Sequence, residues 1–259
     1  MHNTCLMYIA ETNSTNDLLR QHPEYVTVRT DFQTSGRGQQ GNGWESERGK
    51  NLLFSTLLIR PQIDVEKQFV LSMAVCVALR QAVLDTIGTD TIGQASSLCI
   101  KWPNDLYAGD RKLAGILIEN SLQAGHIEQS IIGIGLNVNQ QRWVSDAPNP
   151  TSLCLLTGRT YEPEIIMQAF LKNLSEIMQQ PIREIRSAYM ASLYRRKGFH
   201  LWEEREVNIT PTMPQSAPTE RSFEAQITDV TDCGELVLRL RNGQERTYHF
   251  KQVKYVINS

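Results

Sequence analysis

The spacing of hydrophobic residues changes several times along the chain, and each change predicts a different element. Residues 52–59 form an apolar run that Pro61 closes, which predicts a buried strand. Residues 65–87 are apolar on nearly all sides over a length typical of a helix, which predicts a long helix packed against a sheet. Pro163 opens a segment with apolar residues every three or four positions, so a helix is expected there, followed by a second one that runs to about Arg195.

Shorter segments complete an α+β pattern. Ser14 is followed three positions later by Asp17, which is typical of a capped helix N-terminus, so a short helix is expected there. Gly109 and Asp110 predict the turn of a hairpin. Strands are expected where apolar and β-branched residues lie between turn residues, at 25–28, 98–102, 106–108, 113–118 and 130–138.

The composition changes near residue 199, which indicates a second domain. Short alternating β segments follow, and residues 210–219 form a proline-rich insertion. We therefore expect one domain over residues 1–197, with a mixed β-sheet flanked by helices, and a small all-β domain over residues 198–259.

Charge and cysteine content exclude several classes of protein. Lys and Arg number 26 against 28 Asp and Glu, a net charge of -2, and no basic stripe is present, so general nucleic-acid binding is disfavoured. The 5 cysteines are scattered, which argues against a disulfide framework and a zinc ribbon. No signal peptide or membrane-length apolar run is evident, so we expect a cytoplasmic protein with no membrane contact.

A glycine-rich loop is the first candidate for chemistry. Gly36, Gly38 and Gly41 fit the spacing of a dinucleotide-binding turn, but that turn opens into a helix and this loop leads into an apolar strand. A phosphate-binding P-loop is excluded because no Ser or Thr follows the Gly-Lys pair at 49–50. A loop remains whose backbone N–H groups and Arg37 can wrap an anion; an ordinary surface hairpin is the alternative.

A second cluster lies at a predicted strand end. Residues 101–105 place a lysine, an indole, a carboxamide and a carboxylate around a proline. Across the hairpin turn, Lys112 is expected near Tyr107, so that Arg37 and Lys112 converge on one phosphate. A solvated lysine and a core Trp102 are the alternatives for these residues taken singly.

Five motifs in order resemble those of the biotin–protein ligases. They are Ser14-Thr15-Asn16, Gly36-Arg37-Gly38 with Trp44 downstream, Lys101-Trp102-Pro103-Asn104-Asp105, Arg111 to Leu117, and Gly133 to Asn139. The resemblance implies a catalytic fold like that of class II aminoacyl-tRNA synthetases, followed by a small C-terminal β-barrel. It also implies ATP, Mg²⁺ and biotin, formation of biotinyl-5′-AMP, and transfer of biotin to a lysine on the carrier domain of a biotin-dependent carboxylase. A short form without an N-terminal DNA-binding domain is expected, and a homodimer is possible.

The same resemblance implies a role for each site residue. Arg37 and Lys112 contact the reacting groups, and Asp105 orients or deprotonates the acceptor lysine. The ureido ring of biotin is assigned to Ser14, Thr15, Asn16 and Gln33. Gly115, Leu117, Gly133 and Gly135 line the pocket, Trp102, Asn104 and Asn137 lie nearer the nucleotide, and the closing loop contains Gly36, Arg37, Gly38, Gln39 and Trp44. The family loop commonly has a second arginine where this chain has Gln39, so this loop is less positive than usual.

Three other functions are less consistent with the sequence. A lipoate–protein ligase or octanoyltransferase of the same fold is the nearest, but the polar residues 14–16 and the motif at 101–105 favour biotin. A biotin-responsive regulator is disfavoured because the motifs begin too early in the chain for a winged helix to precede them. A generic nucleotide-binding module is disfavoured because neither phosphate-loop pattern fits.

Overall fold

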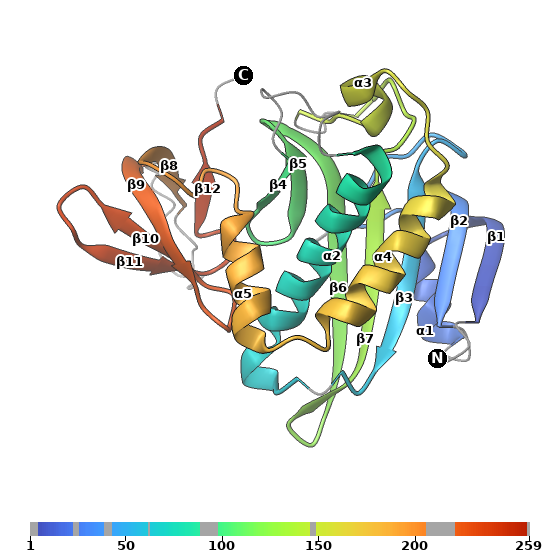
Figure 1. Ribbon diagram of the computed structural model, residues 1–259, viewed down its shortest axis with the longest axis horizontal. Coiled ribbons are helices and arrows are strands. Elements are labelled where there is room, and N and C mark those ends of the chain that lie inside the picture. The colour runs from blue at the N-terminus through green and yellow to red at the C-terminus, as the bar shows by residue number, and fades with distance from the viewer. Residues whose placement is uncertain are drawn as a thin grey trace, which may run out of the picture.

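The computed structural model describes residues 5–22, 26–38, 43–61, 63–88, 98–145, 149–205 and 221–257. These residues form a mixed sheet of seven strands flanked by helices, and an antiparallel sheet of five strands beside it (Figure 1). The predicted α+β architecture is therefore confirmed. Gln39 and the proline-rich insertion at 210–219 lie outside the described residues.

The large sheet has the strand order β1-β2-β3-β7-β6-β5-β4. Its strands are β1 (Leu6–Thr12), β2 (Thr27–Gln33), β3 (Leu52–Ile59), β4 (Leu98–Lys101), β5 (Asp105–Ala108), β6 (Arg111–Gln123) and β7 (His126–Leu136). Of the neighbouring strands in this sheet, only β1 and β2 are parallel, so the chain between them must cross one face of the sheet. The strand expected at 25–28 instead runs to Gln33, which places that side chain at the end of β2.

Helices cover both faces of this sheet, because the apolar strand β3 is buried on both sides. Phe54 packs edge-on against Phe170 of α4 (Pro163–Ile177), whereas Leu57 lies in a separate cluster with Leu19 of α1 (Thr15–Gln21). Successive side chains of a strand point to opposite faces, so α1 and α4 lie on opposite faces. Figure 1 shows α2 (Phe69–Ile87) and α5 (Ile182–Ala191) on the same side as α4.

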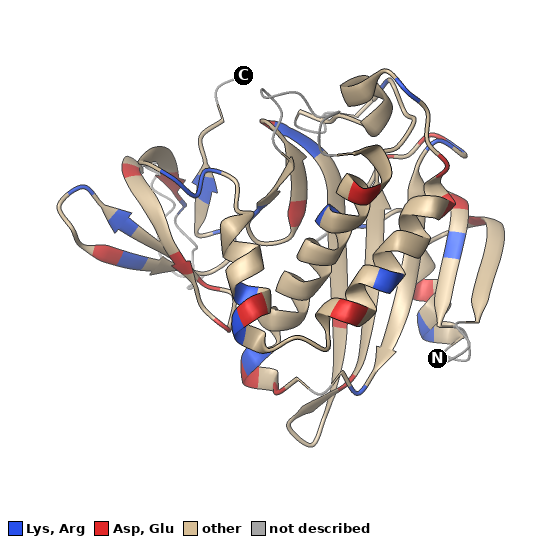
Figure 2. Ribbon diagram, in the orientation of Figure 1, with Lys and Arg blue, Asp and Glu red and all other residues tan. Residues whose placement is uncertain are grey.

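The long helix predicted at 65–87 is divided in two. A 3₁₀ turn, η2 (Val65–Lys67), with no buried residue precedes α2, whose first buried residue is Val70. By length and hydropathy α2 passes as a membrane span, but 61% of that stretch is buried inside the protein. It is the core helix that the apolar pattern predicts, and Figure 2 shows few charged residues along it. The short helix α3 (Leu153–Thr157) was not predicted.

The five-stranded sheet confirms the small β region expected after residue 198. Its strands are β8 (His200–Glu204), β9 (Arg221–Val230), β10 (Leu236–Leu240), β11 (Glu245–Tyr248) and β12 (Val253–Tyr255), in the order β11-β10-β9-β8-β12. The indole Nε1 of Trp102 donates to the carbonyl of Gly234 at 2.9 Å, and Arg186 pairs with Asp229 and Asp232 at 2.5 and 2.6 Å. These contacts join the two sheets, and one hydrophobic cluster includes side chains of both.

Candidate functional site

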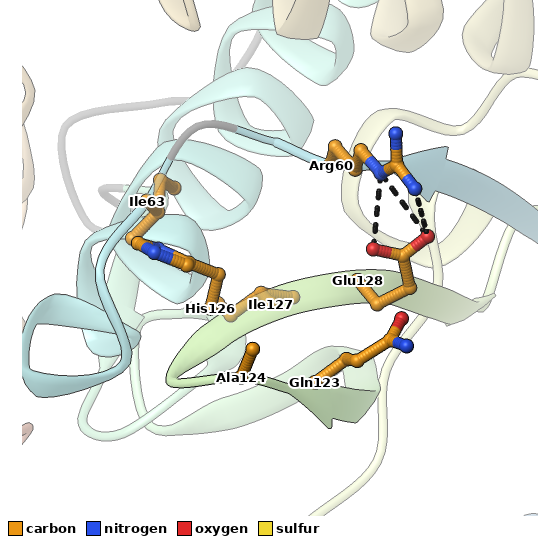
Figure 3. A pocket seen from close by; sticks show the side chains of 7 residues that line it. All are labelled: Arg60, Ile63, Gln123, Ala124, His126, Ile127 and Glu128. Carbon is orange, nitrogen blue, oxygen red and sulfur yellow. Dashed lines mark hydrogen bonds and ion pairs between the residues drawn. The ribbon is translucent and has the colours of Figure 1, made fainter.

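One cavity of about 1230 Å³ lies between the large sheet, the loop after β2 and the C-terminal strand β12. Every site residue expected from the sequence lines it, except Gln39, which lies outside the described residues. They are Ser14, Thr15, Asn16, Gln33, Gly36, Arg37, Gly38, Trp44, Trp102, Asn104, Asp105, Lys112, Gly115, Leu117, Gly133, Gly135 and Asn137. A second cavity, at the β6–β7 hairpin, contains the Arg60–Glu128 pair and none of these residues (Figure 3).

The start of α1 supplies a buried polar wall to the larger cavity. Thr15 and Asn16 are each only 3% exposed. The backbone N of Thr15 donates to Oε1 of Gln33 at 2.8 Å, and the Thr15 hydroxyl lies 3.1 Å from the same oxygen. Since buried polar groups need partners, these bonds fix the wall in one arrangement.

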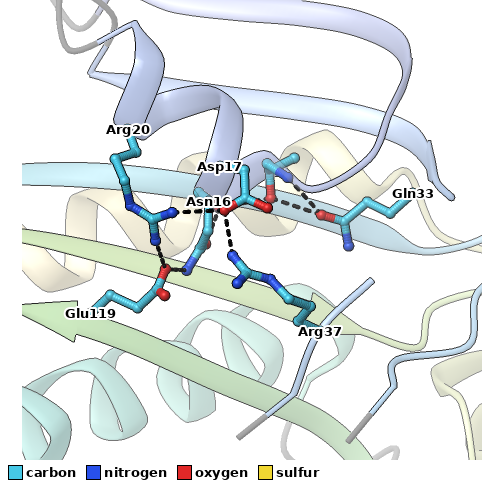
Figure 4. A network of polar contacts seen from close by, with 8 residues as sticks. Asn16, Asp17, Arg20, Gln33, Arg37 and Glu119 are labelled. Carbon is cyan, nitrogen blue, oxygen red and sulfur yellow. Dashed lines mark hydrogen bonds and ion pairs between the residues drawn. The ribbon is translucent and has the colours of Figure 1, made fainter. Parts of the chain in front are cut away.

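The capping interpretation of Ser14 and Asp17 is wrong in detail, although the helix is where it was predicted. Ser14 occupies the N-cap position, but its side chain makes no cap hydrogen bond. Asp17 accepts from Arg20 at 2.8 Å and from Arg37 at 2.6 Å (Figure 4). Tertiary partners therefore replace the expected local bond.

Two residues that sequence reasoning missed complete the wall. The hydroxyl of Ser55 on β3 lies 2.7 Å from Oγ1 of Thr15 and 2.6 Å from Oδ1 of Asn16. Glu119 on β6 accepts from Nδ2 of Asn16 at 2.7 Å (Figure 4). The sequence contained a signal for Ser55, which is a polar residue inside the apolar run 52–59. A polar group that is buried in this way needs a hydrogen-bond partner.

Glycines on β6 and β7 let two side chains approach the sheet. Gly115 and Gly135 lie opposite one another, and the Trp44 ring covers both. A Cβ on Gly135 would lie 2.5 Å from this ring, and one on Gly133 would lie 2.2 Å from Oδ1 of Asn16. Glycines inside a strand indicate that another group lies close to the strand backbone. Here these groups are the side chains of Trp44 and Asn16.

The glycine loop has the paired ends of a hairpin and also lines the cavity. The backbone N of Trp44 donates to the carbonyl of Gly36 at 2.9 Å, and Arg37 and Gly43 form an antiparallel bridge. A Cβ on Gly36 would lie 2.7 Å from the carbonyl oxygen of Trp44, so this close pairing requires a glycine. The loop can therefore be a hairpin and still be placed to bind an anion.

Glu45 ties this loop to the segment after β7. Its carboxylate accepts from the backbone N of Val144 and Ser145 at 2.8 and 2.9 Å. Burial alone would raise the pKa of Glu45, but the hydrogen bonds from Ser145 and Val144 outweigh it and hold the pKa below its ordinary value. The carboxylate is therefore stabilised in its charged form at this position.

Both predicted cations line the cavity, and each pairs with a carboxylate. Nη2 of Arg37 lies 2.6 Å from Asp17, and Nζ of Lys112 lies 2.8 Å from Asp105. Lys112 pairs with Tyr107 across the β5–β6 ladder, as the hairpin predicts. The convergence of Arg37 and Lys112 on one anion stays a prediction.

The side chains of the motif at 101–105 make contacts within the protein core and also line the cavity. Trp102 is 4% exposed and bonded to the second sheet, so it fits the core alternative while also lining the cavity. Asn104 donates to the carbonyl of Ile116 at 2.7 Å. Burial lowers the pKa of Lys101, whose Nζ lies 4.8 Å from the ring centroid of Tyr107.

Some buried polar atoms in the cavity lining have no hydrogen-bond partner in the described part of the chain. They include Nε1 of Trp44 and Oδ1 of Asn137, whose Nδ2 donates to the carbonyl of Thr151 at 3.0 Å. An unpaired buried polar group costs about 1–3 kcal/mol. A ligand that bonds to these atoms would remove that cost.

Comparison with known proteins agrees with this arrangement. Residues 8–137, about half of the chain, match the model of the Biotin/lipoate A/B protein ligase family. The Bifunctional ligase/repressor BirA of Bacillus subtilis (strain 168) is 29% identical over 235 residues, which cover 87% of this chain and 65% of that protein. The Biotin--[acetyl-CoA-carboxylase] ligase of Paracoccus denitrificans is 30% identical over 197 residues, which cover 71% of this chain and 78% of that protein.

The fold has solved counterparts. The biotin protein ligase from Aquifex aeolicus in complex with biotin and ATP superimposes with a TM-score of 0.72 and 20% identity, over 97% of this chain and 99% of that one. The seven-stranded sheet with its helices is thus the biotin ligase catalytic fold. The chain belongs to the biotin/lipoate A/B protein ligase family.

Proposed function

We propose that this chain is an ATP-dependent biotin–protein ligase. It adenylates biotin to biotinyl-5′-AMP and transfers the biotinyl group to a lysine on the carrier domain of a biotin-dependent carboxylase. One observation carries the proposal: a single cavity joins a buried hydrogen-bonding wall to two cations. The wall suits a polar ring, and the cations suit a carboxylate and a phosphate.

The first step is attack of the biotin carboxylate on the α-phosphorus of ATP, with pyrophosphate as the leaving group. Both reacting groups are negative and repel one another, so fixed positive charge is needed between them. Arg37 and Lys112 supply this charge by exchanging their carboxylate partners for the reacting groups. A donor placed in this way contributes roughly 3 kcal/mol to the transition state.

In the second step, the neutral amine of the acceptor lysine attacks the acyl carbon, and AMP leaves. The amine must lose a proton to form the amide. Asp105 lines the cavity beside Lys112 and is the proposed acceptor or orienting group for that proton.

Magnesium enters with ATP in this proposal and is held largely by phosphate oxygens and water, as is usual for this ion. Within the described residues, no group of three or more His, Cys, Asp or Glu side chains is placed to hold a metal by itself. The loop of Gly36, Arg37, Gly38 and Trp44 covers the adenylate and excludes water. The cytoplasmic location, the homodimer and the domain boundary at 197/198 stay predictions from the sequence.

Incubation with ATP, magnesium and labelled biotin tests this function. Labelled adenylate is expected without a carrier, and labelled protein once a biotin carrier domain is added. Lipoate in place of biotin is expected to give neither product. Absence of both biotin products would refute the proposal, and transfer of lipoate alone would assign the chain to the other branch of the family.

A further inference from the structure

Asn16 is held on three sides within the polar wall. Its Nδ2 donates to Oε2 of Glu119 at 2.7 Å, and its Oδ1 accepts from the hydroxyl of Ser55 at 2.6 Å. On the third side, Gly133 leaves room for it only because it has no Cβ. The carboxamide therefore has one position, and its hydrogen-bond partners determine which end is the oxygen and which is the NH₂.

Glu119 decides that orientation. The two ends of a carboxamide have nearly the same size, so hydrogen bonds determine which is the oxygen. A serine hydroxyl can donate or accept, and Ser55 therefore imposes no preference. A carboxylate only accepts, so Glu119 requires the NH₂ of Asn16 to face it. Arg20 lies 2.9 Å from the same carboxylate oxygen and balances its charge.

The direction set at Asn16 passes along the wall. With Oδ1 facing Ser55, the single proton of that hydroxyl goes to Asn16. The oxygen of Ser55 is then an acceptor toward Thr15, 2.7 Å away. The amide of Gln33 is fixed separately, because the backbone N of Thr15 donates to its oxygen, so the NH₂ of Gln33 lies on the side of Gly36 and the cavity. Reversal of Asn16 would reverse the hydroxyls that follow.

We propose that Glu119 is a positioning residue for recognition of the biotin ring. It is not part of the cavity lining, but it fixes which groups of the wall donate and which accept. The ureido group has one carbonyl acceptor and two N–H donors, so a wall of fixed direction distinguishes it from a ring of equal shape with a donor in place of the carbonyl. The inference rests on the proposed function for the identity of the ligand.

The test compares biotin with 2-iminobiotin in the variant Glu119→Gln. Iminobiotin has the same shape, but an imino nitrogen that donates when protonated replaces the ring carbonyl. Glutamine has the size of glutamate and can present either oxygen or NH₂ to Asn16, so the fixed direction is lost. The preference for biotin, measured by titration calorimetry, is expected to fall at least about tenfold, the equivalent of ~1.4 kcal/mol. The KM for ATP is expected to stay unchanged.

Glu128→Gln is the matched control. Glu128 pairs with Arg60, its side chain is 30% exposed like that of Glu119, and it lies outside the larger cavity. This variant is expected to keep the parent preference. Thermal unfolding of each variant shows whether it is folded.

Glu119→Ala is the second variant, because water in place of the carboxylate can also donate or accept. The same loss of preference is expected. If a folded variant at Glu119 keeps the parent preference, or if the KM for ATP rises as much as that for biotin, the positioning role is wrong. A parent protein that binds no biotin would instead overturn the proposed function, before any variant is compared.

Discussion

The polar side chains at the start of α1 are buried and bonded to one another, whereas the two cations of the same cavity lie in partly exposed ion pairs. Thr15 and Asn16 are each 3% exposed, but the side chains of Arg37 and Lys112 are 42% and 29% exposed. Breaking a buried hydrogen-bond network costs several kcal/mol, while an exposed ion pair is worth about 0–1 kcal/mol. The buried wall is therefore preformed, and the cations can exchange partners when a phosphate arrives.

The largest effect is expected from Lys112→Met, which removes one exchangeable cation. Adenylate formation should fall about 10²–10³-fold, because a fixed positive charge is lost where negative charge develops. Release of pyrophosphate measures this rate. Lys67→Met is the control, because Lys67 pairs with Asp64 and does not line the cavity. Adenylation at the parent rate in Lys112→Met would remove Lys112 from the proposed mechanism.

Arg37→Ala should have the next largest effect, roughly 10²-fold on formation of adenylate or on its retention. Loss of the guanidinium removes the cation that the loop contributes. Quantifying enzyme-bound and released adenylate separates these two results. A variant that transfers biotin to a carrier domain at the parent rate would show that the loop has another role.

In the preformed wall, Gly133→Ala should raise the KM for biotin on the order of tenfold and lower stability by about 1–3 kcal/mol. The new Cβ would lie 2.2 Å from Oδ1 of Asn16, so the wall must shift. Gly43→Ala is the control, because its Cβ would meet nothing closer than 4.0 Å. Calorimetric unfolding and steady-state kinetics check both values, and equal effects at the two glycines would contradict the preformed wall.

The smallest effect is expected from Asp17→Asn, which releases Arg37 without removing it. The ion pair is exposed, so the free energy of unfolding should change by less than about 1 kcal/mol. The KM for ATP should fall by at most about 5-fold, because Arg37 no longer leaves a carboxylate to bind phosphate. Asp64→Asn, which alters the pair with Lys67, is the control. A rise in the KM for ATP would mean that Asp17 holds Arg37 in its working position.

Patterns within short segments predicted much of this structure. The apolar run at 52–59 corresponds to β3 residue for residue, and the helix after Ser14 begins where expected. Glycines at 133 and 135 indicated a close approach to their strand, which Trp44 and Asn16 make. In each case the residues that made the prediction possible lie close together in the sequence.

Contacts between distant segments were not predictable in the same way. Ser55 and Glu119 meet Asn16 across separations of 39 and 103 residues, and nothing in their own segments indicates that partner. Asp17 fits a capping pattern, but Arg37 reaches it from the glycine loop. Local propensity is a weak signal where such tertiary contacts compete with it.

The bond between Asn16 and Glu119 also has a consequence for the order of folding. Contacts between residues far apart in the sequence form slowly, because a long loop must close first. The wall cannot be complete until β6 has docked in the sheet, although α1 and β2 are synthesised well before β6. During refolding, recovery of biotin binding should therefore lag behind recovery of the far-ultraviolet helical signal, and a chain emerging from the ribosome acquires its recognition wall only after β6 has followed.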